Sequence, residues 1–282
     1  MATIQQPLAI VGGGVMAQAI IRGGLDAGVM DPTLIGVVEP DGARRDVFRS
    51  WGVRAVKHAQ DLLHWLRAAE GRPGAGQLLL AVKPQSLEEV GGQLRPWLGL
   101  ERRVTITILA GTPSHRVHQQ LGQAGVVVRV MPNTPARIRR ATTAVALGVG
   151  AVEGDQEMAI HIFSALGRVV RIDESLMDAF TAVAGSGPAY VFYLAEAMTA
   201  AAMRVGFDHD TAAAIVRWTV TGSAALLDAT DQPPEALRAA VTSKGGTTAA
   251  AVAVLDAAQV KDAMARAIAA ARDRGAELGR LA

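Results

Sequence analysis

The chain has 282 residues and a formal net charge of +2; half of its residues are apolar, 4% are aromatic and none is cysteine. The lack of cysteine excludes disulfides, thiolate metal ligands and a cysteine nucleophile. The small net charge and the few aromatic side chains argue against nucleic-acid binding, so the arginine-rich run at 137–140 is interpreted as a solvated cluster. No stretch reaches the roughly 18 apolar residues of a membrane span, and residues 1–7 are too short and polar for a secretory signal. We therefore expect a cytoplasmic protein without a membrane partner.

Residues 8–150 alternate short β-rich runs with helical stretches. The predicted strands cover residues 8–11, 34–38, 53–56, 78–82, 104–109, 126–130 and 143–147. Several of these runs are continuously apolar, as expected of parallel strands that are buried on both faces. Strands separated by helices imply right-handed crossovers and a doubly wound sheet. Residues 1–172 are therefore predicted to form an α/β domain.

The strand signal ends at about residue 172, and only helical stretches follow. They cover residues 174–183, 188–204, 210–229, 234–241, 248–257 and 259–279. Small residues stand on nearly every helical face, which favours close contact between helices, within one chain or between subunits. Residues 173–282 are predicted to form a separate, all-helical domain.

A glycine-rich motif follows the first predicted strand and opens a helix. In its G-x-G-x-x-A pattern, Gly12 allows a tight turn, Gly14 lets a pyrophosphate approach the backbone, and Ala17 lets the helix pack on the strand. Val15 and Met16 stand in the first helical turn, where backbone N–H groups bind phosphate. A glycine-rich turn without a ligand is the weaker alternative, because a series of strand–helix units follows. The motif predicts that the N-terminal domain is a Rossmann-type dinucleotide-binding domain.

The end of the second predicted strand carries residues that bear on the choice of dinucleotide. Glu39 stands where an acidic side chain typically accepts a hydrogen bond from the ribose 2′-OH of NAD and repels the 2′-phosphate of NADP. This position slightly favours NADH. Arg44 or Arg45, at the start of the next helix, could instead reach a 2′-phosphate, or both could belong to a solvated face.

Further candidate cofactor residues follow the fourth and sixth predicted strands. Ligands of such sheets bind in the crevice at the carboxyl ends of the strands. The sequence places Ala81, Val82, Lys83 and Pro84 at one of these ends, and Asn133, between two prolines, at the other. We expect these residues to line the nicotinamide side, although a strand-end lysine is as often merely exposed to solvent.

Residues 242–248, with the sequence Thr-Ser-Lys-Gly-Gly-Thr-Thr, interrupt an alanine-rich helical region. Each glycine disfavours helix by about 1 kcal/mol relative to alanine, so a loop followed by a new helix is predicted. Free backbone N–H groups at the start of that helix could bind a carboxylate or a phosphate. A helix cap whose hydroxyls satisfy their own backbone explains the composition equally well.

Together these segments resemble the pyrroline-5-carboxylate reductase family. The matching residues follow the family order over nearly the whole chain, at 11–17, 81–85, 129–135, 184–192 and 241–248. The resemblance implies hydride transfer from NADPH or NADH to the C=N carbon of a small cyclic imino acid, which gives L-proline. It also implies that the helical domain binds substrate and interlocks two subunits, as a homodimer or a ring of dimers.

The resemblance also assigns roles within the loop at 242–248. Ser243, Gly245, Gly246 and Thr247 resemble the residues that hold the substrate carboxylate, and Thr248 resembles the threonine that hydrogen-bonds the ring nitrogen. No histidine, metal cluster or nucleophile triad is placed by a motif, and no metal site is predicted. This agrees with a reaction in which the protein mainly positions an already electrophilic imine against the cofactor.

Four features depart from the family pattern. Lys244 replaces a common proline, Ala184 replaces a common serine, Pro40 stands near a common arginine, and residues 137–141 lack the usual glycines. Two alternatives therefore stay open, a reductase of another cyclic imino acid and a non-catalytic, nucleotide-binding regulatory homologue. The intact Thr248 and the intact glycine motif argue against the second.

Overall fold

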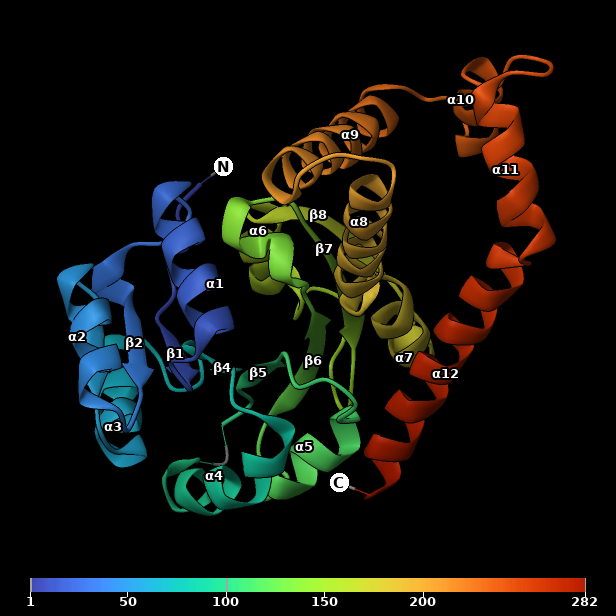
Figure 1. Cartoon of the computed structure of the whole chain (residues 1–282). Helices are drawn as coiled ribbons and strands as arrows, with labels where there is room; N and C mark the ends of the chain where they lie inside the picture. Colours follow the sequence, from blue (N-terminus) through green and yellow to red (C-terminus); the bar gives the residue numbers. More distant parts are fainter. Residues whose placement is uncertain (1, 100, 282) are drawn as a thin grey trace. The chain divides into compact units, whose positions relative to one another are not determined.

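The computed structural model describes residues 2–99 and 101–281 (Figure 1). The chain divides into two compact units, one formed by Met1–Ser186 together with Ala271–Ala282 and the other by Gly187–Ala270. The first, here named the sheet unit, contains every strand of the described chain, and the second, here named the helical unit, contains only helices and their connections.

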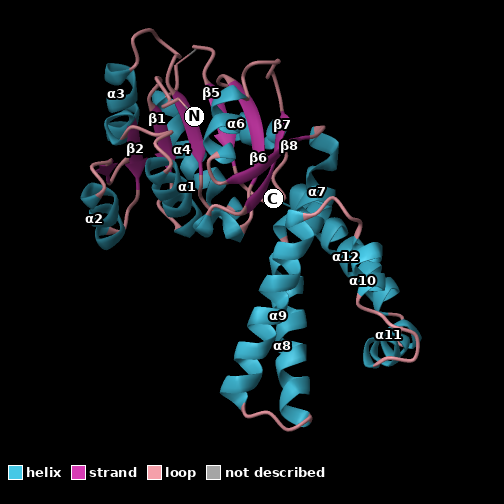
Figure 2. Cartoon of the chain, turned by 90° about the horizontal axis from the view of Figure 1, so that it is seen from above, coloured by secondary structure: helices cyan, strands magenta, loops and turns pink. Residues whose placement is uncertain are grey.

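The sheet unit is built on one eight-stranded sheet with the strand order β3-β2-β1-β4-β5-β6-β7-β8 (Figures 1 and 2). Its strands are β1 (Leu8–Val11), β2 (Ile35–Val38), β3 (Arg54–Val56), β4 (Gln77–Leu80), β5 (Val104–Thr107), β6 (Val126–Met131), β7 (Ala141–Leu147) and β8 (Gly167–Arg171). Neighbours from β3 to β6 pair in parallel, and the chain winds outward from β1 in both directions. This topology confirms the predicted doubly wound α/β architecture.

Successive side chains of the central strands point to opposite faces of the sheet and fill two separate apolar clusters. In β1, Leu8 and Ile10 belong to one cluster, and Ala9 and Val11 belong to the other. The helices that cover the first face are α1 (Val15–Asp26), α2 (Gly42–Ser50) and α6 (Glu157–Ser164). Those that cover the second are α3 (Ala59–Ala69), α4 (Leu87–Leu94) and α5 (Ser114–Gln120). Burial on both faces explains why a strand such as β1 is apolar throughout.

The last two strands differ from the prediction. β7 runs antiparallel to β6, and β8 pairs in parallel with β7. The connection from β6 to β7 consists of residues 132–140, including a 3-10 helix, η4 (Thr134–Ile138). It is too short for a parallel crossover, which needs about a dozen residues or more, so the crossover expected at this point is wrong. β8 is missing from the predicted strands because it is an exposed edge strand in which two of five residues are arginine.

An irregular helix connects β8 to the helical unit. It consists of a 3-10 turn, η5 (Glu174–Leu176), a short α7 (Met177–Phe180) and a π-helical turn (Thr181–Gly185). The carboxylate of Glu174 accepts hydrogen bonds from the backbone N–H of Ser114 at 2.7 Å and from its hydroxyl at 2.6 Å. It also pairs with Arg129 of β6 at 3.2 Å. Glu174 therefore fixes the start of this helix to both α5 and the sheet.

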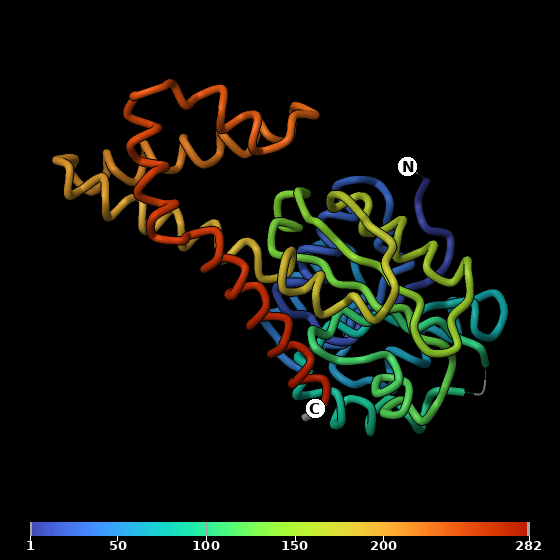
Figure 3. The backbone as a smooth tube through the Cα atoms, turned by 90° about the vertical axis from the view of Figure 1, so that its right-hand side faces the viewer, coloured from blue at the N-terminus to red at the C-terminus, as the bar shows by residue number. Residues whose placement is uncertain are grey.

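The helical unit contains α8 (Gly187–Arg204), α9 (His209–Ala229), α10 (Pro234–Ala240), α11 (Thr247–Ala257) and the first half of α12 (Val260–Leu281), whose second half belongs to the sheet unit (Figure 3). α8 and α9 lie side by side and are joined by a short turn (Figure 2). These helices agree with the stretches predicted from the sequence.

Large apolar side chains lie on the surface of the helical unit. Phe192 and Tyr193 of α8 are 66% and 75% exposed, and Trp218 of α9 is 69% exposed. An exposed apolar surface of this kind usually marks a protein–protein interface. Along residues 2–99 and 101–281, no helix combines the length and the apolar character needed to cross a bilayer.

Candidate dinucleotide cleft and substrate loop

The turn after β1 requires glycine at its first position. Gly12 has a φ of +99°, a conformation that residues with a side chain rarely adopt. Its backbone N–H donates to the carbonyl oxygen of Val38 at 3.0 Å. A Cβ atom at this position would lie 2.8 Å from the carbonyl oxygen of Ala81 and 2.9 Å from a methyl group of Val82. The backbone can follow this path between β2 and β4 only without a side chain.

Gly14 has a different reason to be glycine. It is the N-cap of α1 and has extended backbone angles. A Cβ atom at this position would meet no atom of the described residues within 4 Å, so the space above the helix start is open. Free N–H groups at a helix start, beside open space, form a site suited to an anion. Ala17 is fully buried, as its predicted contact with the sheet requires.

Glu39 is committed to hydrogen bonds inside the protein. Its side chain is 7% exposed, and its two carboxylate oxygens accept from the backbone N–H groups of Gly13 and Asp41, each at 2.9 Å. Arg45 is also used locally, because its guanidinium donates to the carbonyl oxygens of Glu39 and Pro40. Arg44 lies 3.9 Å from the carboxylate of Glu39 and remains 56% exposed. Glu39 thus fastens the glycine-rich turn to the end of β2.

A cleft of about 870 Å³ lies at the carboxyl ends of β1, β2, β3 and β4. It brings together several of the predicted cofactor residues: Gly12, Gly14, Glu39, Ala81, Val82 and Lys83. The remaining predicted residues do not line it. Of these, Pro84 begins the next 3-10 turn (Pro84–Ser86), the side chain of Val15 is exposed, and that of Met16 packs against the core.

Lys57 and His58 line the same cleft and are missing from the predicted residues. They directly follow β3, and their place in the sequence is the signal that could have revealed them, because the ends of parallel strands meet at one edge. Together with Arg44, Lys57 gives this end of the cleft a cationic character.

Asn133 lies beyond β6 and makes its hydrogen bonds within the protein. It is 8% exposed. Its amide nitrogen donates to the carbonyl oxygen of Ala184 at 2.9 Å, and its amide oxygen accepts from the backbone N–H of Thr142 at 3.0 Å. Asn133 therefore joins the turn after β6 to the π-helical turn, and its contact with a cofactor stays a prediction.

The loop at 242–248 belongs to the helical unit. Gly245 has a φ of +72°, and Gly246, whose N–H donates to the carbonyl oxygen of Ser243 at 3.1 Å, is the N-cap of α11. Among the described residues, no side chain caps this helix. The hydroxyl of Thr242 donates to the carbonyl oxygen of Arg238 at 2.6 Å, whereas the hydroxyls of the other three residues make no hydrogen bond with the described chain. The hydroxyl groups of Ser243, Thr247 and Thr248 are therefore available to a ligand.

Comparison with known proteins identifies the family. The family described as pyrroline-5-carboxylate reductase dimerisation matches residues 174–278. A pyrroline-5-carboxylate reductase of Synechocystis is 40% identical over 97% of this chain and 98% of its own length. The chain belongs to the pyrroline-5-carboxylate reductase family. A second pyrroline-5-carboxylate reductase, from Methanosarcina acetivorans, is 36% identical over 98% of both chains. The resemblance seen in the sequence is confirmed.

Solved structures of pyrroline-5-carboxylate reductases share the fold. That of the Coxiella burnetii enzyme aligns with a TM-score of 0.86 at 31% identity, over 98% of this chain and 99% of that one. The Plasmodium falciparum enzyme, solved with NADP bound, aligns with a TM-score of 0.83 over 99% of this chain and all of its own; at 24% identity, this likeness concerns the fold alone.

Two departures from the pyrroline-5-carboxylate reductase pattern have a local structural account. Arg139, in the stretch without glycines, adopts a φ of +58° and donates from Nε to the carbonyl oxygen of Ala165 at 3.0 Å. This contact holds the turn after η4 against the end of α6. At Ala184, the carbonyl oxygen takes part in binding Asn133, so the loss of a serine hydroxyl leaves that link intact.

Proposed function

We propose that the protein reduces 1-pyrroline-5-carboxylate to L-proline by hydride transfer from NADPH or NADH, the last step of proline biosynthesis. The observation that carries this proposal is the 40% identity to a pyrroline-5-carboxylate reductase over nearly the full length of both chains. The glycine-rich turn and the cleft beside it support the cofactor assignment.

The proposed roles of the residues follow from their chemistry. The N–H groups at the start of α1, beside Gly14, bind the pyrophosphate of the dinucleotide. Ala81, Val82, Lys83 and Pro84 approach its nicotinamide side, and a bound reduced nicotinamide supplies the hydride. The loop at 242–248 binds the substrate carboxylate through Ser243, Gly245, Gly246 and Thr247. The hydroxyl of Thr248 bonds the ring nitrogen, which orients the imine carbon toward the hydride.

One assay tests reaction and cofactor together. Purified protein is supplied with 1-pyrroline-5-carboxylate and either NADPH or NADH, and both nucleotide oxidation and proline are measured. We expect proline in a one-to-one ratio with oxidised nucleotide. Absence of oxidation with both nucleotides would contradict the proposal and favour a non-catalytic homologue. A higher kcat/KM on the six-membered analogue would instead indicate another cyclic imino acid as substrate.

Thr248→Ala is expected to lower kcat/KM for the imine about threefold to tenfold, the value of one hydrogen bond of about 0.5–1.5 kcal/mol. The hydroxyl of Thr248 has no partner among the described residues, so its removal breaks no internal bond. Steady-state kinetics on Thr248→Ala and Thr248→Ser test this. The serine variant keeps the hydroxyl and should retain most of the activity; equal losses in both variants would argue against the assigned bond.

We further propose NADPH as the preferred reductant, because Glu39 is held inside the protein while Arg44 and Lys57 line the cleft. Arg44→Gln should lower kcat/KM for NADPH about tenfold or more, since hydrogen bonds to charged groups are worth about 1.5–3 kcal/mol, and leave NADH within about twofold. Arg49→Gln on the same helix is a matched control, because Arg49 pairs with Asp46 instead. Equal losses with both nucleotides would contradict this preference.

We also propose that residues 173–282, of which 187–270 form the helical unit, supply the substrate-binding and dimerisation surfaces of a cytoplasmic homodimer or ring of dimers. The matched family region and the exposed aromatic side chains of α8 and α9 support assembly through the helical unit. Light scattering coupled to size-exclusion chromatography measures the mass directly. A monomer at micromolar concentration would contradict the proposal.

A further inference from the structure

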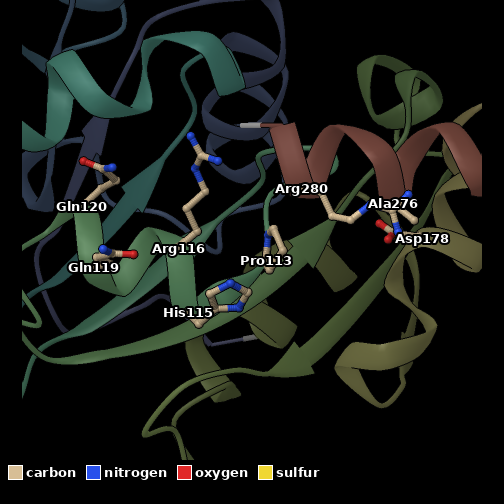
Figure 4. A pocket seen from close by; sticks show the side chains of 9 residues that line it. Pro113, His115, Arg116, Gln119, Gln120, Asp178, Ala276 and Arg280 are labelled. Carbon is tan, nitrogen blue, oxygen red and sulfur yellow. The ribbon is translucent and has the colours of Figure 1, made fainter.

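A second cavity, of about 580 Å³, lies on the sheet unit and shares no lining residue with the dinucleotide cleft (Figure 4). Its wall is formed by α5 with the preceding Pro113, by α7 and by the last turns of α12, all of which belong to the sheet unit. Its volume falls within the range of about 300–1,000 Å³ that is typical of small-molecule sites. The proposed reductase activity assigns no role to it.

Unpaired positive charge lines this cavity. Arg116 of α5 and Arg280 of α12 both line it, against a single acidic residue, Asp178 of α7. Within residues 2–99 and 101–281, neither arginine forms an ion pair. Some other surface arginines do, as in the pairs Arg22–Asp26 and Arg274–Glu277. The cavity therefore carries a net positive charge that the described chain does not neutralise.

Arg116 also leaves a donor without an acceptor. Its Nε is buried and finds no hydrogen-bond partner among the described residues. Such groups are rare in proteins, because a buried donor that has lost water and gained no acceptor is destabilising. This buried Nε cannot be reached from the cavity, so the terminal nitrogens of the guanidinium are the groups that can meet a ligand there. The uncommitted terminal nitrogens of Arg116 and the uncompensated charge thus point to an anionic occupant.

The geometry of the guanidinium groups indicates the chemistry of the ligand. A guanidinium presents its N–H groups in a planar fork that fits a carboxylate or a phosphate. Figure 4 shows Arg116 between Gln119 and Gln120 of α5 on one side and the α12 turn that carries Arg280 on the other. The two glutamine amides add neutral donors and acceptors beside the charged centre. We propose that this cavity binds a small anionic molecule through a carboxylate or phosphate group held by Arg116 and Arg280.

Isothermal titration calorimetry of the full-length protein tests this inference, with pyrophosphate and malonate as probes at constant ionic strength. We expect one or both to bind with a Kd of about 1 mM or lower. Arg116→Gln, Arg116→Lys and Arg280→Gln should each weaken binding about tenfold or more, because each removes charge-assisted hydrogen bonds. Arg280 lies on an exposed turn, so its variant tests the site even where Arg116 variants fold poorly.

Two control variants assign the binding to the cavity. Arg44→Gln removes a cation from the dinucleotide cleft, and Arg22→Gln removes a paired surface arginine; binding should survive both. Binding that is lost only with Arg44→Gln would place the anion in the dinucleotide cleft and overturn the inference. So would the absence of heat beyond that of a sodium chloride control, or binding that persists in the Arg280 variant. The inference does not depend on reductase activity, which is measured separately.

Discussion

Gly12→Ala should lower the free energy of unfolding by about 2–5 kcal/mol and remove most dinucleotide binding. The left-handed backbone at +99° adds about 1–2 kcal/mol of strain for a residue with a Cβ atom. The contact of 2.8 Å with the carbonyl oxygen of Ala81 forces a shift of the backbone, which adds about 1–3 kcal/mol. Urea denaturation measures the first effect, and fluorescence titration with NADPH measures the second.

Gly14→Ala provides the matched control for that result. Its backbone is extended, and the added methyl group meets no described atom within 4 Å. We expect the free energy of unfolding to change by less than about 1 kcal/mol. The KM for the dinucleotide should rise by about tenfold or more, because the methyl group enters the space proposed for the pyrophosphate. A stability loss equal to that of Gly12→Ala, or an unchanged KM, would contradict this division of roles.

Glu70→Ala is expected to destabilise the protein by about 3–5 kcal/mol, because it leaves the charge of Arg103 buried and unpaired. The side chains of Glu70 and Arg103 are 3% and 7% exposed, and their closest N–O distance is 2.7 Å. The carboxylate also accepts from the backbone N–H groups of Gly74 and Gly76. Urea denaturation at pH 7 measures the loss.

An exposed ion pair gives the comparison for Glu70. Arg171 and Glu153 are 54% and 72% exposed and lie 2.7 Å apart. Glu153→Ala should change the free energy of unfolding by no more than about 1 kcal/mol, because solvent screens the pair. If Glu70→Ala is as mild as Glu153→Ala, the buried pair does not hold the loop before β4 in place.

The same carboxylate predicts a pH dependence of stability. Burial raises the pKa of Glu70, but the hydrogen bonds from Arg103, Gly76 and Gly74 outweigh it, and the pKa lies below its usual value of 4.5. Its contribution to stability is therefore full above that value and is lost as the pH falls through the lowered pKa. Between pH 7 and pH 3, the melting temperature of Glu70→Gln should fall less steeply with decreasing pH than that of the unaltered protein.

The central sheet is predictable from the sequence because burial on both faces leaves an unbroken apolar run, as in β1. β8 gives no such signal, since its alternate side chains lie in solvent. The direction of β7 depends on the length of a connection that only becomes clear once the ends of β6 and β7 are known. Strand existence is thus encoded locally, whereas strand direction is set by the chain between strands.

The site residues likewise differ in whether the local sequence is enough to predict them. Gly12 is recognisable because a backbone conformation demands its residue type. The internal bonds of Glu39 and Asn133 are not, because their partners come from distant parts of the chain. Lys57 and His58 belong to no motif, and the folding of β3 beside β2 is what carries them to the cleft.

The bonds of Glu39 constrain how coenzyme choice can evolve in this protein. Glu39, the residue predicted to meet the ribose, anchors Gly13 and Asp41, so a mutation made there to change selectivity is expected to weaken the turn as well. The side chains of Arg44 and Lys57 do not anchor the backbone of this turn. Selection for a new coenzyme, in nature or in the laboratory, is therefore expected to proceed through these two cations, with Glu39 retained.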